Sequence, residues 1–234
     1  MSRRVIVVLG PTWYESPFHD LEGYKVIRKL EMLDKNPEEV ALAVFSGGED
    51  VEPCLYGGQD PRNVCYTNIR RDYFEQRVFN HCRKHAIKMT GICRGFQFLN
   101  VMSGGKMYQH LNYHGEYHPA YFSWKKEDYA VSSTHHQMVY LPEDAIPIIW
   151  SSMRRSNIYI GPTGEFATPP EKEIEAAIFP STKIVGVQFH PEMMLPTAPG
   201  YVAYIELMTD YLSLSFENFL AKYLEVNHVK RAQA

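Results

Sequence analysis

The chain has 234 residues, of which 45% are hydrophobic and 22% are charged, and its formal net charge is −3. This length and composition fit a globular protein with a sizeable core, and the weak negative charge without a basic stripe excludes a typical nucleic-acid-binding protein. No apolar run approaches the roughly 20 residues of a membrane helix, and residues 5–9 are too few for the apolar region of a signal peptide, so we expect no membrane partner.

Apolar runs alternate with helix-like segments along the chain, which indicates parallel βαβ units. The expected strands are residues 4–9, 24–30, 40–45, 86–92, 129–133, 146–151, 175–179 and 184–189, of which 24–30 also fits a helix face and 129–133 and 146–151 resemble pieces of hairpins. Asp72 is expected to cap a helix that ends near His85, with Glu75 as the capping-box acid. Further helices are expected at 96–102 and, as one continuous amphipathic helix, at 201–223.

The most informative stretch is residues 90–97, Thr-Gly-Ile-Cys-Arg-Gly-Phe-Gln, which joins an expected strand to a helix. Cys93 stands between Gly91 and Gly95, and this spacing is typical of a nucleophile elbow, because side chains on either side of so tight a turn would collide with the backbone. A helix start also favours a thiolate and offers the free N–H of Arg94 to an oxyanion. The alternative is a buried structural cysteine beside turn glycines.

A second stretch, residues 186–192, ends an apolar strand with the sequence Phe-His-Pro-Glu. A cysteine nucleophile needs a base, and the base needs a third group that fixes its ring. We therefore predict that Cys93, His190 and Glu192 form a catalytic triad. The alternative for His190 is an ordinary exposed or core histidine, since the chain has ten.

A third stretch places Gly47 and Gly48 directly after the expected strand at 40–45. Glycines at this place let backbone N–H groups approach a substrate closely, so Gly48 is the candidate second oxyanion donor. A glycine-rich turn without a catalytic role is the alternative.

Together these motifs resemble the class I (triad-type) glutamine amidotransferase superfamily, and within it the γ-glutamyl-γ-aminobutyrate hydrolase branch. Further marks of the resemblance are residues 46–57, Arg71 and Asp72 with Glu75, residues 104–109, and Ser-Thr-His-His-Gln at 133–137. The resemblance implies one flavodoxin-like α/β domain over residues 1–234, a three-layer sandwich around a mostly parallel sheet. It also implies a γ-glutamyl thioester on Cys93, oxyanion donors at Gly48 and Arg94, and no cofactor. The residues that it places around the glutamyl group are Gly47, Gln97, Ser133, His135 and Gln137.

His110, His114 and His118 recur every four residues, and on one helix they would share a face as metal ligands do. Gly115 and Pro119 argue against a continuous helix there, so we expect a loop that borders the active site and no metal.

The expected function is hydrolysis of a small-molecule γ-glutamyl amide or glutamine. One alternative is a glutaminase that passes ammonia to a separate synthetase or amidoligase partner, and another is a non-catalytic binding module on the same fold. The four cysteines form no C-x-x-C pair, which favours a reducing, cytoplasmic location. A homodimer remains an open alternative to a single chain.

Overall fold

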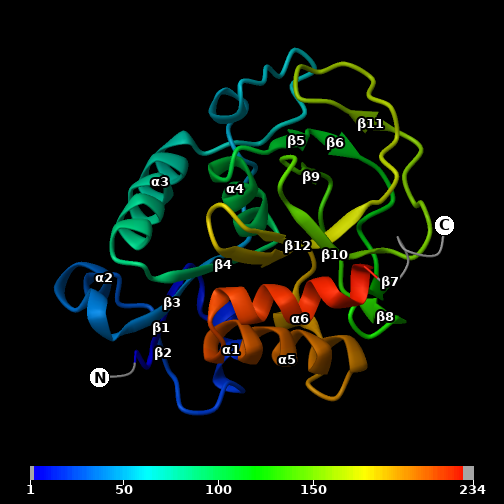
Figure 1. Ribbon diagram of the computed structural model, residues 1–234. Helices are drawn as coiled ribbons and strands as arrows, with labels where there is room; N and C mark the ends of the chain where they lie inside the picture. Colours follow the sequence, from blue (N-terminus) through cyan, green and yellow to red (C-terminus); the bar gives the residue numbers. More distant parts are fainter. Residues whose placement is uncertain (1–2, 229–234) are drawn as a thin grey trace.

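The computed structural model describes residues 3–228. Its centre is a nine-stranded sheet in the order β2-β1-β3-β4-β13-β12-β10-β7-β8 (Figure 1). Pairing is parallel from β2 to β13 and antiparallel from β13 to β8. The strands of this sheet are β1 (Val5–Leu9), β2 (Lys25–Ile27), β3 (Val40–Phe45), β4 (Lys88–Ile92), β7 (His118–Phe122), β8 (Glu127–Val131), β10 (Ile146–Ser151), β12 (Ile174–Phe179) and β13 (Ile184–Val187).

Helices cover both faces of the sheet, as Figure 1 shows for α3 and α4 on one side and α5 and α6 on the other. The helices are α1 (Ser16–His19), α2 (Glu31–Lys35), α3 (Ile69–Lys84), α4 (Arg94–Met102), α5 (Pro199–Ser213) and α6 (Phe216–His228). The short 3₁₀ helices are η1 (Thr12–Glu15), η2 (Pro37–Glu39), η3 (Pro53–Tyr56) and η4 (Pro191–Met193). Two small sheets pair β5 (Lys106–Tyr108) with β9 (Met138–Tyr140) and β6 (His110–Leu111) with β11 (Tyr159–Ile160).

Side-chain alternation along the strands produces the layers. In β1, Val5, Val7 and Leu9 join the core under α3 and α4, whereas Ile6 and Val8 join the core under α5 and α6. All five side chains are buried, which is why a parallel strand of this kind is a continuous apolar run. The predicted α/β three-layer fold is therefore confirmed.

Two helix predictions were wrong. α3 begins at Ile69, and its N-cap is Asn68, whose side chain accepts a hydrogen bond from the Arg71 amide (3.3 Å). Asp72 therefore lies inside the helix, and Glu75 is no capping-box acid. Both carboxylates are instead buried against arginine side chains, as described below.

The expected helix at 201–223 is two helices, α5 and α6. Leu214 has an extended backbone (φ −89°, ψ 158°), which ends α5 and reverses the chain. The reversal lets Phe219 pack against Tyr211, with ring centroids 5.3 Å apart, and Tyr223 against Trp124 at 5.1 Å. Within the described range, none of the helices combines the length and apolar character that crossing a bilayer requires.

Candidate active site

The candidate site lies where three parallel strands end together. β3, β4 and β13 are neighbours in register, with Val44 and Val185 both paired to Thr90. The carboxyl ends of adjacent parallel strands share one edge of the sheet, where open α/β proteins bind their ligands. The three predicted motifs follow these strands directly, so the fold brings them to one place.

The turn after β4 has the strained backbone of a nucleophile elbow. Cys93 adopts φ 52° and ψ −112°, although it is not glycine, and its N–H donates to the Val187 carbonyl (2.8 Å). A Cβ on Gly91 would overlap the backbone of Gly95, and a Cβ on Gly95 would overlap the Phe45 carbonyl. Both glycines are therefore required by backbone contacts, as the sequence predicts.

Cys93, His190 and Glu192 lie in hydrogen-bonding contact. Glu192 Oε1 lies 2.7 Å from His190 Nδ1, and the Cys93 thiol interacts with the same ring. Since Glu192 occupies Nδ1, Nε2 is the ring nitrogen that is left for the thiol, and Thr134 Oγ1 lies 2.9 Å from it. The Ser132 hydroxyl donates to the His190 carbonyl (2.6 Å) and accepts from its N–H (3.0 Å), which fixes the loop.

The surroundings of His190 favour its protonated form. Burial lowers the pKa of this imidazole, but the contacts with Cys93 and Glu192 outweigh burial and raise the pKa to about 10. At neutral pH the ring is therefore protonated. A ring in this state is ready to protonate a leaving group.

The glycine loop after β3 is held by one arginine. Arg71 donates to the carbonyls of Ser46 (2.9 Å) and Gly47 (3.0 Å), and a Cβ on Gly48 would overlap its guanidinium. Gly48 has φ +142°, a conformation that L side chains rarely adopt. Among residues 3–228, no acceptor pairs with the Gly48 amide. The Arg94 amide is likewise a first-turn donor of α4, so both expected oxyanion donors lie at strand ends beside the elbow.

The Arg94 side chain forms a buried ion-pair network. Its guanidinium binds the Asp72 and Glu75 carboxylates, and Glu75 also binds Arg71 Nε (2.9 Å). The Arg94 side chain is 2% exposed, and the two carboxylates are similarly buried. This network joins α3 to the start of α4 and to the glycine loop. Sequence reasoning missed it, although the acid spacing Asp72-x-x-Glu75 beside two arginines was visible.

Tyr14 is a second residue that the sequence did not reveal. Its ring lies 6.2 Å from the His190 ring, and a Cβ on Gly47 would overlap its hydroxyl. Burial raises its pKa, and the charges of Glu192 and Cys93 raise it further, so the phenol remains protonated beside the triad. No sequence motif singles out this tyrosine.

The other predicted substrate residues form a buried polar layer beside α4. Gln97 Nε2 donates to the Gln137 carbonyl and to Gln188 Oε1, both at 3.2 Å, and Gln137 Nε2 donates to the Gln109 carbonyl at 3.1 Å. Ser133 Oγ donates to the His114 carbonyl. In the 133–137 segment, Thr134 is the residue that touches His190.

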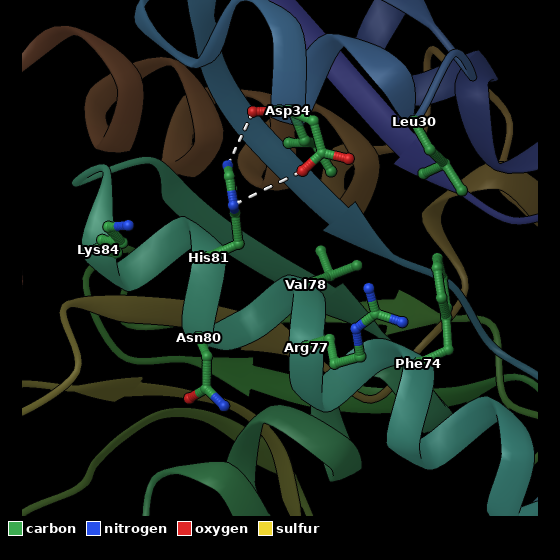
Figure 2. A pocket seen from close by; sticks show the side chains of 9 residues that line it. Leu30, Asp34, Phe74, Arg77, Val78, Asn80, His81 and Lys84 are labelled. Carbon is green, nitrogen blue, oxygen red and sulfur yellow. Dashed lines mark hydrogen bonds and ion pairs between the residues drawn. The ribbon is translucent and has the colours of Figure 1, made fainter.

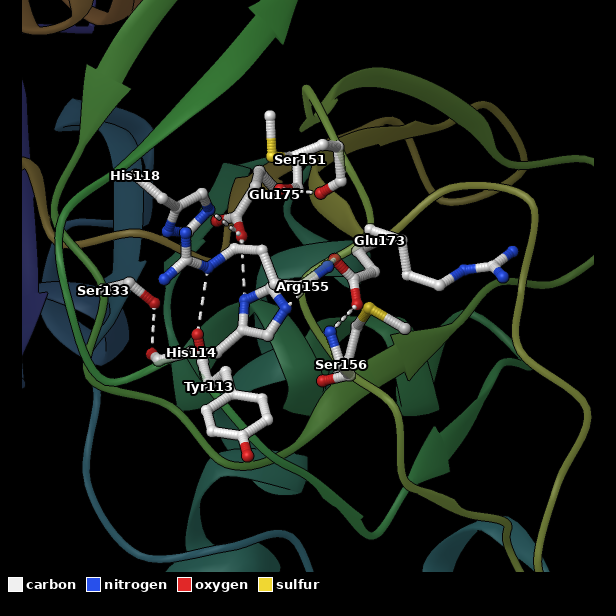
Figure 3. A network of polar contacts seen from close by, with 12 residues as sticks. Tyr113, His114, His118, Ser133, Ser151, Arg155, Ser156, Glu173 and Glu175 are labelled. Atoms are coloured by element: carbon white, nitrogen blue, oxygen red, sulfur yellow. Dashed lines mark hydrogen bonds and ion pairs between the residues drawn. The ribbon is translucent and has the colours of Figure 1, made fainter.

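The histidines of residues 110–136 divide into two groups. His114 and His118 lie with His135 around Glu175, inside the protein (Figure 3). His110 and His136 form a separate, more exposed pair, in which His136 Nε2 lies 3.1 Å from Asp50. The three histidines with fourfold spacing therefore do not form one group; they share no helix, but the expected loop was only partly right, because His110 lies in β6 and His118 begins β7.

Two hollows open near the glycine loop. One of about 350 Å³ is lined by residues that include Trp13, Tyr14, Gly47 and Gly48. Another of about 420 Å³ lies between α2 and α3, where His81 points toward Asp34 (Figure 2). No triad residue lines either hollow, but the first is lined by the glycine loop and by Tyr14, whose ring lies 6.2 Å from the His190 ring, so it is the better candidate for substrate.

Comparisons with known proteins identify the family and the fold. Residues 27–192 match the family model of Peptidase C26. Protein NtpR of Enterococcus hirae is 26% identical over 168 residues, which are 67% of this chain and 68% of that protein. A putative glutamine amidotransferase-like protein, the YvdE homolog of Lactococcus lactis subsp. cremoris, is 33% identical over 151 residues, 56% of this chain and 76% of that protein.

Solved structures show the same fold at low identity. A putative GMP synthase subunit from Thermoplasma acidophilum superposes with a TM-score of 0.55 at 14% identity, covering 99% of both chains. A glutamine amidotransferase from Thermotoga maritima gives 0.52 at 16% identity, covering 99% of this chain and 94% of that one. The chain therefore belongs to the Peptidase C26 family, within the class I glutamine amidotransferase-like superfamily.

Proposed function

We propose that the protein hydrolyses a γ-glutamyl amide through a thioester on Cys93. The observation that carries the proposal is the position of Cys93, in a positive-φ turn at the start of α4 and hydrogen-bonded to an imidazole that Glu192 orients. This is the arrangement that activates a thiol and fixes the tautomer of its base.

In the first half-reaction, the Cys93 sulfur, having given its proton to His190, attacks the γ-carbonyl carbon. The carbonyl oxygen becomes an oxyanion, which the amides of Gly48 and Arg94 stabilise by hydrogen bonds. The C–N bond then breaks while His190 Nε2 delivers its proton to the leaving nitrogen. An amine leaves, and the γ-glutamyl group remains on sulfur.

In the second half-reaction, a water molecule replaces the amine. His190 accepts a proton from this water, and the hydroxide attacks the thioester carbonyl carbon. The C–S bond breaks, glutamate leaves, and the sulfur and the ring again share one proton. Glu192 holds Nδ1 throughout, so the ring keeps Nε2 toward the reacting atoms.

The hollow beside Gly47 and Gly48 supports an organic amine rather than ammonia as the leaving group. Its wall includes Trp13, Leu30 and Phe74, which are 62%, 36% and 42% exposed. Apolar side chains next to a reaction centre bind the carbon skeleton of a ligand, which ammonia lacks. We therefore place the amine half of the substrate in this hollow and the glutamyl half toward Cys93.

The test is mass-spectrometric trapping of the acyl-enzyme with a panel of γ-glutamyl amides and glutamine. We expect a γ-glutamyl adduct on the peptide that contains Cys93 and release of glutamate and amine. Cys93→Ala should abolish both, whereas Cys54→Ala, which removes an exposed thiol, should leave them unchanged. Turnover retained in Cys93→Ala would exclude the mechanism.

The same assay separates the alternatives. Glutaminase activity that rises sharply on addition of a synthetase partner would favour the ammonia-donating alternative over the hydrolase. If Cys93 reacts neither with the amides nor with a diazo-ketone analogue of glutamine, the protein is a non-catalytic binding module.

A further inference from the structure

A second polar centre lies outside the triad, and it consists of three imidazoles and two carboxylates. We call it the histidine–glutamate cluster, and it comprises His114, His118, His135, Glu173 and Glu175. Each of these side chains is 0–2% exposed. Figure 3 shows His114 and His118 directed toward Glu175 at the centre and Glu173 on the far side of His114.

Three ring nitrogens converge on one carboxylate oxygen, Glu175 Oε1. Glu175 Oε1 lies 3.0 Å from His118 Nε2, 3.5 Å from His135 Nε2 and 3.7 Å from His114 Nδ1. Ligand atoms of His114, His118 and Glu175 all lie within 4.8 Å of one another. Four buried atoms of the cluster have no hydrogen-bond partner, namely both ring nitrogens of His114, His135 Nε2 and Glu175 Oε2.

The other ring nitrogens face groups that accept hydrogen bonds. His118 Nδ1 lies 3.2 Å from the Glu116 carbonyl, and His135 Nδ1 lies 2.9 Å from the Gln137 carbonyl. A carbonyl only accepts, so each Nδ1 carries a hydrogen, and Nε2 is the atom through which either ring binds Glu175 or, after losing its proton, a metal ion.

In His114 the two ring nitrogens exchange places, so that Nε2 faces away from Glu175. Its Nε2 lies 3.3 Å from Glu173 Oε2. Glu173 already accepts from the amides of Arg155 and Ser156, both at 2.8 Å, and from the Tyr159 hydroxyl at 2.6 Å. This carboxylate is therefore an acceptor on the Nε2 side of the ring, and His114 Nδ1 is the nitrogen that faces Glu175.

We propose that the histidine–glutamate cluster is a metal site for Zn²⁺, with His114, His118 and a Glu175 oxygen as ligands. Buried nitrogen and oxygen atoms without hydrogen-bond partners are costly, and a cation among them would offset this cost. In tetrahedral zinc sites with arms of about 2.0–2.1 Å, neighbouring ligand atoms are about 3.3 Å apart, and Glu175 Oε1 lies 3.0 Å from His118 Nε2 and 3.7 Å from His114 Nδ1.

The types of ligand favour Zn²⁺ over other ions, and the burial of the ligands favours a structural role. Imidazole and carboxylate ligands suit Zn²⁺, whereas Mg²⁺ and Ca²⁺ prefer oxygen alone. Acceptors behind each ring, here the Glu116 carbonyl behind His118 and Glu173 behind His114, are the usual support of zinc-bound histidines. The three ligand side chains are 0% exposed and none belongs to the triad, so the ion would stabilise the fold and take no part in catalysis.

The position of the cluster gives the ion a link to the triad. His135 belongs to the 133–137 segment, whose Thr134 touches His190. The Glu175 carbonyl accepts from the Gln188 amide (2.7 Å), two residues before His190. A zinc ion would thus join residues 114–118 to β12 behind the base of the triad, and the contact of His135 with Glu175 would link the 133–137 segment to it.

The test begins with the metal content of untagged wild-type protein. Because the site is closed, the protein is unfolded with chelator and refolded with or without Zn²⁺ or Co²⁺. We expect one firmly held ion per chain, a higher thermal midpoint with Zn²⁺, and a visible Co²⁺ spectrum of a four-coordinate site without thiolate bands. The readout needs no substrate and is independent of the proposed hydrolase activity.

Variants locate the ion. His118→Gln should abolish retention, and Glu173→Gln should weaken it roughly 10–100-fold because Glu173 supports His114. The matched control is His136→Gln, from the exposed histidine pair, which should retain the ion fully. If wild-type protein refolds to the same thermal midpoint without metal and holds none, or if His136→Gln and His118→Gln lose the ion equally, the proposal is wrong.

Discussion

Replacing Arg94 by methionine tests whether its buried ion-pair network supports the elbow. Methionine keeps the length of the side chain and the α4 backbone, but it leaves Asp72 without a cation, while Glu75 keeps Arg71 (2.9 Å). Leaving a buried carboxylate unpaired costs about 3–5 kcal/mol of the free energy of unfolding. Asp72 retains one hydrogen bond, from the Glu52 amide (3.1 Å), so we expect a loss at the lower end of this range.

The dependence of this destabilisation on pH is a second prediction for the same variant. Burial raises the pKa of Asp72 above its usual value even though Arg94 lowers it. Without Arg94 the pKa rises further, so the folded variant binds a proton more readily than the unfolded chain does. The destabilisation should therefore be largest well above this pKa and shrink as the pH falls through it.

Urea unfolding of wild type and Arg94→Met at about pH 8 and about pH 5 measures both effects. Arg70→Met is the control, because Arg70 is exposed on the same helix and should change stability by less than about 0.5 kcal/mol. A loss below about 1 kcal/mol in Arg94→Met, or an equal loss at both pH values, would refute the reasoning.

Three further predictions concern the elbow and the triad. Gly95→Ala should destabilise the fold by about 1–3 kcal/mol or more and abolish activity, because the added Cβ would overlap the Phe45 carbonyl. The control is Gly115→Ala, whose added Cβ would have no atom within 4 Å, and it should leave the stability measured by urea unfolding unchanged. Cys93→Ala should lower the His190 pKa from about 10, and NMR titration of the ring measures this change. In wild type, the stability that the raised pKa contributes is complete below about pH 6.5 and should disappear as the pH rises through about 10. An unchanged pKa in the variant would show that Cys93 does not hold the proton on the ring. Tyr14→Phe should lower kcat/KM by about tenfold with a loss of about 1 kcal/mol in stability, and unchanged kinetics would mean that the hydroxyl has no part in positioning the glycine loop.

Local sterics explain why the elbow and the β strands could be predicted. The constraint on Gly91 comes from the backbone of Gly95 and Phe96, within five residues, and the spacing of both glycines around Cys93 is a pattern that is visible in the sequence, although Gly95 is constrained by the distant Phe45. The run at 40–45 is apolar throughout because both faces of β3 are covered, and its bounds were predicted as observed. The order of the strands then determines which motifs meet.

Other features depend on contacts between distant residues, which periodicity cannot reveal. The apolar stripe through Leu212 and Phe216 continues in register, yet the chain turns at Leu214 because Phe219 packs on Tyr211. Asp72 has the residue type of a helix cap, but its partner Arg94 is 22 residues away. The sequence shows that Asp72 is charged, but it does not show which charged residue is its partner.

The histidine spacing illustrates how far a motif can be interpreted without the fold. Fourfold spacing of His110, His114 and His118 suggested a helical face, and the glycine and proline nearby ruled that out correctly. The cluster that forms instead takes His118 from a strand and adds Glu175 from β12, 57 residues further along the chain. A metal site assembled across a sheet carries no local pattern, so rejecting the helical site did not exclude this one.

The reacting groups of the site lie close together, whereas the residues that hold them in place lie on several elements of the fold. Cys93, His190 and the glycine loop each follow a different strand, so their alignment depends on how firmly those three loops are held. Arg94 and Arg71 hold the elbow and the glycine loop from α3, and the histidine–glutamate cluster holds the segment behind His190. Buried charges are costly unless each is paired, and a fold that keeps them at two places beside one site gains rigidity there at the expense of stability. Substitutions in the support should therefore change stability and activity together, whereas removal of the thiol should abolish activity and change stability only through the pKa of His190.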